Sequence, residues 1–370
     1  MEDAFRFADE LGPAKIVHIH VPGLGLRGTL VIDNAAAGPT IGGLRMAPDV
    51  STEECFRLAR AMTLKNAAAG LPHGGGKSVL YGDPHLPLER KEPLVRAMAC
   101  ALADEKDYIF GPDMGTDETC MAWVHAEIGR AVGLPRELGG IPLDELGATG
   151  FGLAHACEVA AARKGFGLAG ARVVVQGLGS VGLHAARFLA QRGAVLVAAS
   201  DSRGAVHDPK GLDIEALAAH KRSGGSAAEA PVGRPLDPAD LVAVECEIWI
   251  PAARPDAIRE NDAPRLRTRL VVAGANIPTT LGAERWLHAH GILNVPDFIA
   301  NAGGVICAAM EYAGASQAAA FDAIAERVRA NTEQVLRESE RRGVLPREAA
   351  VDLAVSRVRR AMGWRRWSVF

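Results

Sequence analysis

The chain has 370 residues, of which 48% are hydrophobic, and a formal net charge of −3. This length exceeds what one core usually sustains, so we expect two domains, and the lack of a basic excess argues against nucleic acid or an anionic membrane as a partner. The six cysteines are scattered without a Cys-x-x-Cys pair, and no signal peptide or long apolar span is apparent. The sequence therefore predicts a soluble, cytoplasmic protein with reduced thiols and no metal site.

The first third of the chain predicts two paired strands, at 15–20 and 26–33, then a glycine-rich bend and a helix. Ser51 and Glu54 have the spacing of a capping box at the start of that helix. Met62 and Lys65 fall on one stripe of it, so Lys65 is expected to point inward. An inward ammonium needs an anionic partner, and a substrate carboxylate is the natural candidate.

The segment 63–79 holds two of only eight lysines in the chain, Lys65 and Lys77, with three consecutive glycines at 74–76 between them. We expect these glycines to allow close backbone approach and positive φ. A lysine, unlike an arginine, shifts its pKa readily when it is desolvated or crowded by another cation, so the pattern indicates chemistry. The alternative is a glycine-rich turn that carries two solvated lysines.

Asp113 lies in a loop between Pro112 and a probable helix. Thr116 or Asp117 can cap that helix, so Asp113 is not required as the cap. It is either an ordinary turn residue or a catalytic carboxylate.

From residue 147 onward strands and helices alternate, which is the mark of a doubly wound domain. A strand at 171–176 is followed at once by Gly177-Leu-Gly179-Ser-Val-Gly182, a helix and a second strand at 194–201. This order predicts dinucleotide binding, with the pyrophosphate at the helix N-terminus. Later strands end at Ala252 and Asn276, which should line the nicotinamide side of the cofactor.

Asp201 follows Gly182 by nineteen residues, where the acid that binds the adenosine ribose is expected. Ser200 and Arg203 flank it, so a 2′-phosphate remains possible. NAD is thus the expected cofactor, NADP is not excluded, and a plain turn residue is the alternative for Asp201. Five arginines near the end of the chain, at 357, 359, 360, 365 and 366, are expected to form a solvated or subunit-contact surface.

Several of these motifs, in this order, closely resemble the glutamate/leucine/phenylalanine/valine dehydrogenases. The motifs are Gly42-Gly-Leu-Arg, Lys65, Leu71-Pro-His-Gly-Gly-Gly-Lys-Ser-Val, Pro112-Asp-Met-Gly-Thr, the glycines at 177–182, Gly274-Ala-Asn-Ile-Pro-Thr-Thr and Asn301-Ala-Gly-Gly-Val. The resemblance covers about residues 27 to 312. It implies an α/β protein with an N-terminal substrate and oligomerisation domain (1–147), a Rossmann domain (148–330) and C-terminal helices (331–370) that pack back on the first domain. It also implies a catalytic cleft between the domains and a homo-oligomer.

The resemblance further implies an NAD(P)-dependent L-amino acid dehydrogenase. Lys77 resembles the catalytic lysine that activates water, Asp113 the aspartate that shuttles the proton of the amine, and Lys65 the lysine that holds the α-carboxylate. Asn301 resembles the asparagine near the substrate α-carbon. The expected substrate-binding residues are Lys65, Ile41, Gly42, Gly43, Met62, Asn301 and Ala308. The expected cofactor-binding residues are Thr149, Gly177, Gly179, Ser180, Val181, Gly182, Asp201, Ala252 and Asn276.

Substrate choice is where the sequence departs from the glutamate enzymes of the family. These enzymes place a lysine and a serine where this chain has Ile41 and Ala308. An unpaired buried carboxylate there costs several kcal/mol, whereas an apolar side chain gains about 1.5 to 3 kcal/mol. We therefore expect reversible deamination of an apolar, aliphatic or aromatic, L-amino acid to the 2-oxo acid and ammonia.

Two alternatives stay open. Glutamate is the substrate if His73 or Arg45 pairs with its side-chain carboxylate. A catalytically silent, nucleotide-binding subunit of a hetero-oligomer is the other alternative, against which the joint presence of Lys65, Lys77 and Asp113 argues.

Overall fold

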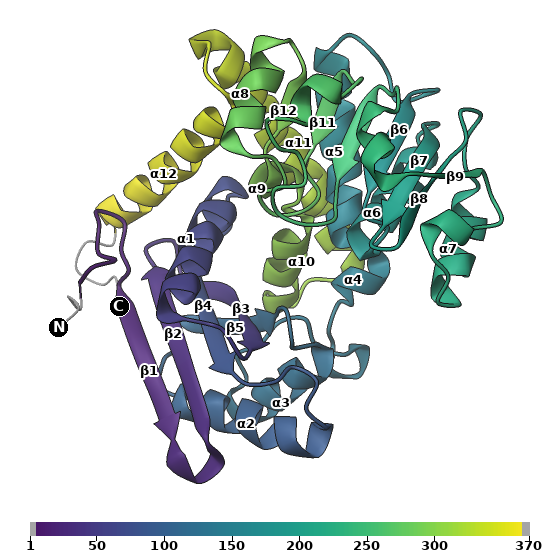
Figure 1. The fold of residues 1–370 in the computed structure, drawn as a ribbon. Coiled ribbons are helices and arrows are strands. Elements are labelled where there is room, and N and C mark those ends of the chain that lie inside the picture. Colours follow the sequence, from purple (N-terminus) through teal and green to yellow (C-terminus); the bar gives the residue numbers. More distant parts are fainter. Residues whose placement is uncertain (1–4, 365–370) are drawn as a thin grey trace. The chain divides into compact units, whose positions relative to one another are not determined.

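The structure, a computed structural model, describes residues 5–364 and divides the chain into two compact units (Figure 1). The first unit takes the chain up to residue 143, together with 305–320 and the segment from 351 onward. The second takes 144–304 and 321–350. The break at 143 lies close to the expected boundary at 147, but the C-terminal part is shared between the units, because helices after residue 304 contribute to both.

The first unit is built on a five-stranded sheet with the order β1-β2-β4-β3-β5. Its strands are β1 (Lys15–Val21), β2 (Leu26–Asn34), β3 (Thr40–Ala47), β4 (Gly74–Tyr81) and β5 (Tyr108–Pro112). β1, β2 and β4 pair antiparallel, whereas β3 pairs parallel with both β4 and β5. The helices of this part of the chain are α1 (Thr52–Ala68), α2 (Leu88–Ala101) and α3 (Glu118–Ile128).

Residues on each strand alternate between two buried faces, because successive side chains of a strand point to opposite sides. Leu44 and Leu80 belong to the core shared with α2 and α3, which includes Met98 and Met121. Their neighbour Val79 belongs instead to a smaller core with Cys55 and Ala59 of α1. The sheet is thus covered by α1 on one face and by α2 and α3 on the other, as can be followed in Figure 1.

The expected start of α1 is present, with one change. The Ser51 hydroxyl accepts a hydrogen bond from the backbone N–H of Glu54, as an N-cap does. The Glu54 carboxylate does not complete a capping box, because it binds the guanidinium of Arg45 at 2.6 Å. One backbone N–H of the helix is thus capped by Ser51, and Glu54 in its first turn pairs with Arg45 of β3 instead.

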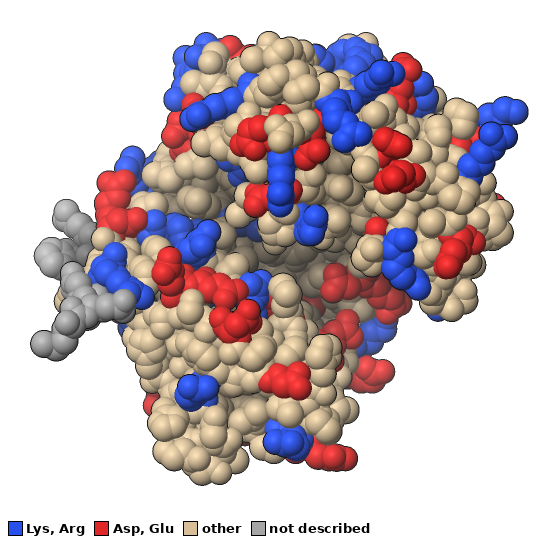
Figure 2. Space-filling view, viewed as in Figure 1, with Lys and Arg blue, Asp and Glu red and all other residues tan. Residues whose placement is uncertain are grey.

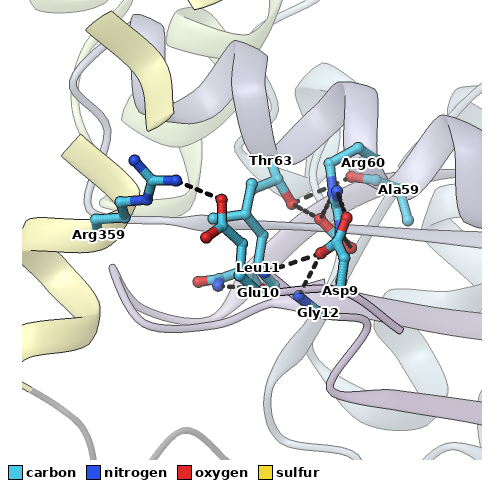
Figure 3. A network of polar contacts seen from close by, with 10 residues as sticks. Asp9, Glu10, Leu11, Gly12, Ala59, Arg60, Thr63 and Arg359 are labelled. Atoms are coloured by element: carbon cyan, nitrogen blue, oxygen red, sulfur yellow. Dashed lines mark hydrogen bonds and ion pairs between the residues drawn. The ribbon is translucent and has the colours of Figure 1, made fainter. Parts of the chain in front are cut away.

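A polar network joins the N-terminal segment 9–12 to α1 and α12 (Pro346–Trp364) within the first unit (Figure 3). Arg60 of α1 donates at 2.6 Å to Asp9 and at 2.8 Å to the buried Asp33. Thr63 donates to the same Asp33 oxygen, and Arg359 pairs with Glu10. These contacts pair the charged groups of the segment with those of α1 and α12.

The second unit has a seven-stranded sheet with the order β12-β11-β10-β6-β7-β8-β9. Its strands are β6 (Arg172–Gln176), β7 (Val195–Asp201), β8 (Gly204–His207), β9 (Arg234–Leu236), β10 (Ile248–Pro251), β11 (Leu270–Val272) and β12 (Leu293–Val295). The strands from β12 to β7 are parallel, whereas β8 returns antiparallel beside β7. With β6 as the first strand, six of the strands follow the 3-2-1-4-5-6 order of dinucleotide-binding domains, with the third strand, β8, reversed and β9 added at the edge beside it.

The helices that follow residue 142 are α4 (Leu143–Leu146), α5 (Ala148–Arg163), α6 (Ser180–Ala190), α7 (Ile214–Arg222), α8 (Leu281–Ala289), α9 (Asp297–Ala300), α10 (Gly303–Tyr312), α11 (Gln317–Arg342) and α12 (Pro346–Trp364). The core of the second unit gathers apolar side chains of its parallel strands, among them Val174, Trp249 and Val271. Parallel strands buried on both faces read as continuous apolar runs, as β6 and β10 do.

The arginine-rich end of the chain was expected to form a solvated or subunit-contact surface, and among its described residues Arg357 differs from that expectation. Arg357 of α12 donates to the carbonyls of Ala67 and Ala68 at the end of α1, at 3.2 and 2.7 Å, which suits a cation beside a helix C-terminus. Arg359 and Arg360 are exposed, and residues 365 and 366 lie outside the described part of the chain. Figure 2 shows basic and acidic side chains interspersed over the visible face, in keeping with the small net charge.

Within residues 5–364, no helix is both long enough and apolar enough to cross a membrane. All six cysteines lie in the described part and are free thiols.

Candidate active site

The glycine-rich segment before Lys77 is a buried strand, β4, and not a turn. The expectation of positive φ at 74–76 is wrong, because none of these glycines adopts it. The expectation of close approach is correct: a Cβ on Gly75 would lie 1.9 Å from the backbone nitrogen of Thr63 in α1. Glycine is thus required here because the last turns of α1 lie directly on the strand.

Strand alternation places the candidate side chains on the face that α1 covers. Lys77 shares the side of β4 that carries Val79, and Ile41, Gly43 and Arg45 share the corresponding side of β3. Lys65 comes from the last turn of α1 and is half-buried. The expected catalytic and carboxylate-binding lysines therefore come from a strand and from the helix that packs on it.

Lys77 is buried, with 6% of its surface exposed, and its ammonium lies 2.7 Å from Asp113 Oδ2. A buried ammonium needs such an anionic partner. Gly43 makes the contact possible, because a Cβ at that position would lie 3.1 Å from Lys77 Nζ and 2.8 Å from the Asp113 Cβ. The structure thus brings together Lys77 from within β4, Gly43 from within β3 and Asp113 from just after the end of β5.

The loop that carries Asp113 is fixed by Thr116. The Asp113 N–H donates to the Thr116 hydroxyl at 3.0 Å, and that hydroxyl donates to the Leu44 carbonyl at 2.7 Å. Asp117, and not Asp113, caps α3. This agrees with the expectation that Asp113 is free of the capping role.

Sequence reasoning considered Arg45 as a partner for a substrate carboxylate and missed its contact with Asp113. The Arg45 Nε donates to Asp113 Oδ2 at 3.0 Å, and its Nη1 donates to Glu54 at 2.6 Å. Burial alone would raise the pKa of Asp113, but Lys77 and Arg45 outweigh it and hold that pKa below its ordinary value. The signal in the sequence is spacing, because Arg45 lies two residues after Gly43 and hence on the same face of β3.

The residues expected around the substrate side chain are apolar or closely packed. Ile41 and Ala308 are buried, and Met62 is half-buried. The carbonyl of Gly42 accepts a hydrogen bond from the Tyr108 hydroxyl at 2.8 Å.

His73 precedes the β4 glycines and is a buried, structural side chain. Its Nδ1 lies 3.0 Å from the Pro39 carbonyl, and its ring packs edge-on against Tyr312 with 5.9 Å between ring centroids. Burial lowers the pKa of His73, despite the hydrogen bond to Pro39. The imidazole is therefore neutral at neutral pH.

In the second unit, the loop between β6 and α6 has the form that a pyrophosphate requires. Gly177 has a φ of 101°, and a Cβ there would lie 2.8 Å from the backbone of Ala252. A Cβ on Gly182 would lie 2.0 Å from the Gly177 carbonyl, whereas one on Gly179 would meet nothing within 4 Å. Gly179 therefore borders open space at the start of α6, where first-turn N–H groups have no partner in the helix. These residues fit a dinucleotide.

The other expected cofactor residues occupy the same end of the unit. Ser180 is exposed and donates from its hydroxyl to the Asp144 carbonyl at 2.9 Å, and Val181 lies in the first turn of α6. Thr149 lies in the first turn of α5, next to the glycine that begins α10.

Asn301 and Asn276, predicted from separate motifs, are bonded to each other. The Asn301 side-chain nitrogen donates to Asn276 Oδ1 at 3.0 Å and to the Gly274 carbonyl at 3.3 Å. The Asn301 Oδ1 is buried without a hydrogen-bond partner among the described residues, as is Gln176 Oε1 just before Gly177. Unsatisfied buried acceptors of this kind are suited to a ligand N–H or O–H. Gln176 was not predicted, because a strand-end glutamine carries no sequence signal of its own.

Asp201 stands at the end of β7, where the expected ribose-binding acid belongs, and its carboxylate is already occupied. It accepts hydrogen bonds from the backbone N–H groups of Arg203, Gly204 and Ala227, and it pairs with Lys221. Among the described residues, no cluster of three or more His, Cys, Asp or Glu side chains is arranged to hold a metal ion.

The chain matches two family models. Residues 13–130 match "Glu/Leu/Phe/Val dehydrogenase, dimerisation domain", and residues 139–366 match "Glutamate/Leucine/Phenylalanine/Valine dehydrogenase". Fold, site and sequence thus define an oxidoreductase of the amino acid dehydrogenase class. The chain belongs to the glutamate/leucine/phenylalanine/valine dehydrogenase family.

Three relatives of the chain are glutamate dehydrogenases from different organisms. The chain is 37% identical to a glutamate dehydrogenase of Aeropyrum pernix, over 90% of this chain and 85% of the relative. It is 36% identical to an NADP(+)-dependent glutamate dehydrogenase of Pyrobaculum calidifontis, over 99% and 94%. It is 35% identical to an NAD-specific glutamate dehydrogenase of Staphylococcus aureus, over 90% and 85%.

Two solved structures resemble the fold. One subunit of a hetero-hexameric glutamate dehydrogenase from Thermus thermophilus, in a Leu-bound form, has a TM-score of 0.85 and 32% identity, covering 95% of this chain and 90% of that one. An L-tryptophan dehydrogenase from Nostoc punctiforme has a TM-score of 0.76 at 24% identity, over 96% and 98%, which shows the fold alone.

These findings confirm the expected two-domain α/β fold, the family and the enzyme class, an NAD(P)-dependent amino acid dehydrogenase. The match to a dimerisation domain supports an oligomer that acts on a small molecule.

Proposed function

We propose that this enzyme catalyses the reversible, NAD(P)-dependent oxidative deamination of an apolar L-amino acid, giving the 2-oxo acid and ammonia. The observation that carries the chemistry is the ion pair between the buried Lys77 and the half-buried Asp113, at 2.7 Å. A lysine is almost never fully buried unless it is paired, and here Gly43 on the adjacent strand makes room for the pair.

The roles of the two residues follow from their charge states. Asp113 is ionised at neutral pH because Lys77 and Arg45 lower its pKa, so it can take a proton from the substrate ammonium. A bound NAD(P)+ supplies the acceptor for the hydride that leaves the substrate α-carbon. Lys77 then orients and activates the water that adds to the resulting imine, and Asp113 returns a proton to the nitrogen that departs as ammonia.

An apolar substrate is supported by the contacts of Arg45 and His73, the two side chains that were considered as partners for the side-chain carboxylate of glutamate. Arg45 is committed to Asp113 and Glu54. His73 is buried and neutral, because burial lowers its pKa. Ile41 and Ala308, at the positions where glutamate enzymes carry a lysine and a serine, are both buried and apolar. A second carboxylate at these positions would be desolvated without a partner.

Glutamate remains the second candidate, because three relatives that are 35 to 37% identical are glutamate dehydrogenases. The test is a panel of initial rates with NAD and NADP on glutamate, leucine, valine, phenylalanine and tryptophan, and on the matching 2-oxo acids with ammonia. We expect at least one apolar amino acid to exceed glutamate in kcat/KM by about tenfold or more. Faster turnover of glutamate than of all the others would refute the apolar assignment, and no turnover of any would support the silent-subunit alternative.

We also propose that the enzyme is a homo-oligomer, as its dimerisation domain allows. Light scattering on the chain expressed alone tests this, because a monomer without activity that gains activity with a second subunit would indicate a hetero-oligomer. The cytoplasmic location stays a prediction.

A further inference from the structure

Arg347 joins two buried acids in the second unit. It comes from the first turn of α12, and the acids are Glu284 of α8 and Asp297 at the start of α9, helices that can be followed in Figure 1. The Arg347 Nε donates to the Glu284 carboxylate at 2.7 and 3.0 Å, and its Nη2 lies 2.9 Å from Asp297 Oδ1. The side chains of Glu284 and Asp297 are 3% and 7% exposed. Because the desolvation of charges offsets much of what their pairing gains, such buried ion pairs add little to stability by themselves.

Asp297 connects the two chain segments that carry Asn276 and Asn301. Its Oδ2 accepts a hydrogen bond at 2.9 Å from the N–H of Ile277, the residue after Asn276. Its backbone carbonyl accepts one at 2.7 Å from the N–H of Asn301. One residue therefore holds both segments, whose asparagine side chains bind each other at 3.0 Å. Arg347 in turn fixes the Asp297 carboxylate through its other oxygen.

The turn at Ile277 is strained and needs this support. Ile277 has a φ of 48°, in the left-handed region that a β-branched side chain rarely adopts. Such a conformation costs about 1 to 3 kcal/mol, persists only where the surroundings hold it, and is concentrated at ligand-binding sites. The side chain is 54% exposed, so its own packing does little to hold the turn. Two backbone contacts do hold it: the N–H bond to Asp297, and the Ile277 carbonyl, which accepts from the N–H of Asp256 at 3.0 Å.

The orientation of the Asn301 side chain depends on the same turn. Its amide nitrogen donates to Asn276 Oδ1 at 3.0 Å and to the carbonyls of Gly274 and Ala275 at 3.3 and 3.4 Å. Because the nitrogen faces this segment, the Oδ1 on the other side of the amide faces away from it. That Oδ1 is buried without a hydrogen-bond partner among the described residues, and such an acceptor suits a ligand N–H. A shift of residues 274–277 would therefore turn the acceptor away from its ligand.

We propose that Asp297, held by Arg347, is a positioning residue that fixes the strained turn at Ile277 and thereby presents Asn301 Oδ1 to an N–H of a reactant. This inference rests on the proposed function, because it takes Asn301 to contact a reactant of that reaction. The N–H donor is the ammonium of the amino acid or the carboxamide of the nicotinamide, which share this chemistry. Asp297 and Arg347 act through the turn and not by contact with the reactant.

The experiment measures kcat and the KM of both substrates for Asp297→Asn in the full-length enzyme, beside hydrogen exchange of the peptide 274–281 by mass spectrometry. The substitution keeps the size of the side chain and removes the charge that Arg347 holds. We expect kcat/KM to fall about tenfold or more, and exchange of the peptide to become faster. A rise in the KM of the amino acid alone assigns the Asn301 contact to the ammonium, and a rise in the KM of NAD(P) alone assigns it to the carboxamide.

The matched control is Glu247→Gln. Glu247 likewise joins an arginine side chain to a backbone N–H in the second unit, both of Arg172, at 3.2 and 2.7 Å. It contacts neither asparagine segment, so the substitution should leave kcat, both KM values and the exchange of 274–281 unchanged. All rates are measured well below the Tm of each variant, where a loss of stability alone does not change kcat/KM.

A rescue separates positioning from a merely structural role. Glycine adopts a φ of 48° without strain, so a glycine at position 277 has less need of the hold by Asp297. Asp297→Asn combined with Ile277→Gly should therefore recover kcat/KM by about threefold or more over Asp297→Asn, with Ile277→Gly alone as the reference.

Unchanged kcat/KM or unchanged exchange in Asp297→Asn, or no recovery in the double variant, would overturn the inference. If Asp297→Asn does not fold, Arg347→Lys is the second variant, because its single nitrogen cannot replace the two that bind the acids, and kcat/KM should again fall. If the wild type turns over no amino acid, the proposed function is refuted, and the affinity for NAD(P)H decides this inference. Weaker binding by Asp297→Asn would then uphold it with the carboxamide as the donor, and equal binding would overturn it.

Discussion

The ammonium of Lys77 and the carboxylate of Asp113 meet at 2.7 Å on the face of the first sheet that α1 covers. The same Asp113 oxygen also receives the guanidinium of Arg45, at 3.0 Å. Burial would protonate an isolated carboxyl group, and two cations on one oxygen reverse that effect. Asp113 is thus ionised at neutral pH and can accept a proton from a substrate.

Arg45→Gln should move the acid limb of the pH profile of kcat/KM to higher pH, by about one unit. Asp113 must be ionised to accept a proton, and activity is lost as the pH falls through its pKa. Removal of Arg45 raises that pKa, so the loss begins at a higher pH. The measurement is kcat/KM from pH 2.5 to 9, because the wild-type limb lies below the ordinary carboxyl pKa of 3.8. Arg96→Gln, which removes an arginine that pairs with Glu92 and Glu127 and not with Asp113, should leave the limb in place. An unmoved limb in Arg45→Gln would contradict the role given to Arg45.

The double variant Ile41→Lys with Ala308→Ser should shift substrate preference toward glutamate. The change supplies a cation and a hydroxyl where both residues are now apolar and buried. We expect the ratio of kcat/KM for glutamate to that for the best apolar amino acid to rise by about tenfold or more. The two single variants serve as the comparison. A ratio that stays constant in the double variant would show that these positions do not face the substrate side chain.

Much of this site follows from the sequence, and what does not has a physical reason. The sequence predicted the two lysines and Asp113 as site residues from their residue types and their order in the chain. The strand, the glycines and the helix at 171–190 predicted the dinucleotide-binding loop. The local sequence did not predict that residues 74–76 form a strand, because glycine has a low strand propensity. Their strand is set by the approach of α1, at 1.9 Å from a Cβ on Gly75, which is a tertiary contact.

Asp201 illustrates the same limit. Counting from Gly182 placed it correctly at the end of a strand, but counting does not show that the next strand returns antiparallel. The partners that fill its carboxylate come from as far as Lys221 and Ala227. The choice between a ribose-binding acid and a turn residue therefore depends on contacts that only the fold brings together.

Gly75→Ala should destabilise the first unit by about 3 kcal/mol or more, because the added methyl group would collide with the backbone of α1. A backbone atom, unlike a flexible side chain, cannot move aside without shifting the helix. Thermal unfolding followed by circular dichroism is the measurement. Gly23→Ala is the matched control, since its Cβ would meet nothing within 4 Å, and it should change Tm little. Equal Tm values for the two variants would contradict the close approach of α1 to β4.

His155 should make the second unit sensitive to acid. Burial, with Arg192 and Arg329 nearby, lowers the pKa of His155 to about 4, despite the hydrogen bond to Glu158. The unfolded chain takes up this proton below about pH 6.5, whereas the folded protein takes it up only near pH 4. The stabilisation of the folded protein by neutral His155 is therefore complete above pH 6.5. It is lost as the pH falls toward 4, to a total of about 3 kcal/mol of unfolding free energy.

The check on this prediction is urea unfolding at pH 7 and pH 4.5. The loss of unfolding free energy between the two values should be smaller in His155→Leu than in the wild type, by about 2 kcal/mol. His288→Leu, at an exposed position of the same unit, should behave as the wild type does. If all three proteins lost the same unfolding free energy between pH 7 and pH 4.5, His155 would be ruled out as the source of that loss.

The most direct test of the central claim is the turnover of Lys77→Ala, measured beside its binding of NAD(P)H. If Lys77 activates the water at the substrate, kcat should fall by about a thousandfold while NAD(P)H binds as it does to the wild type. Lys106→Ala, which removes a lysine from the loop before β5 in the same unit, is the matched control and should keep full activity. Near wild-type turnover by Lys77→Ala would contradict the assignment of the Lys77 and Asp113 pair as the catalytic centre.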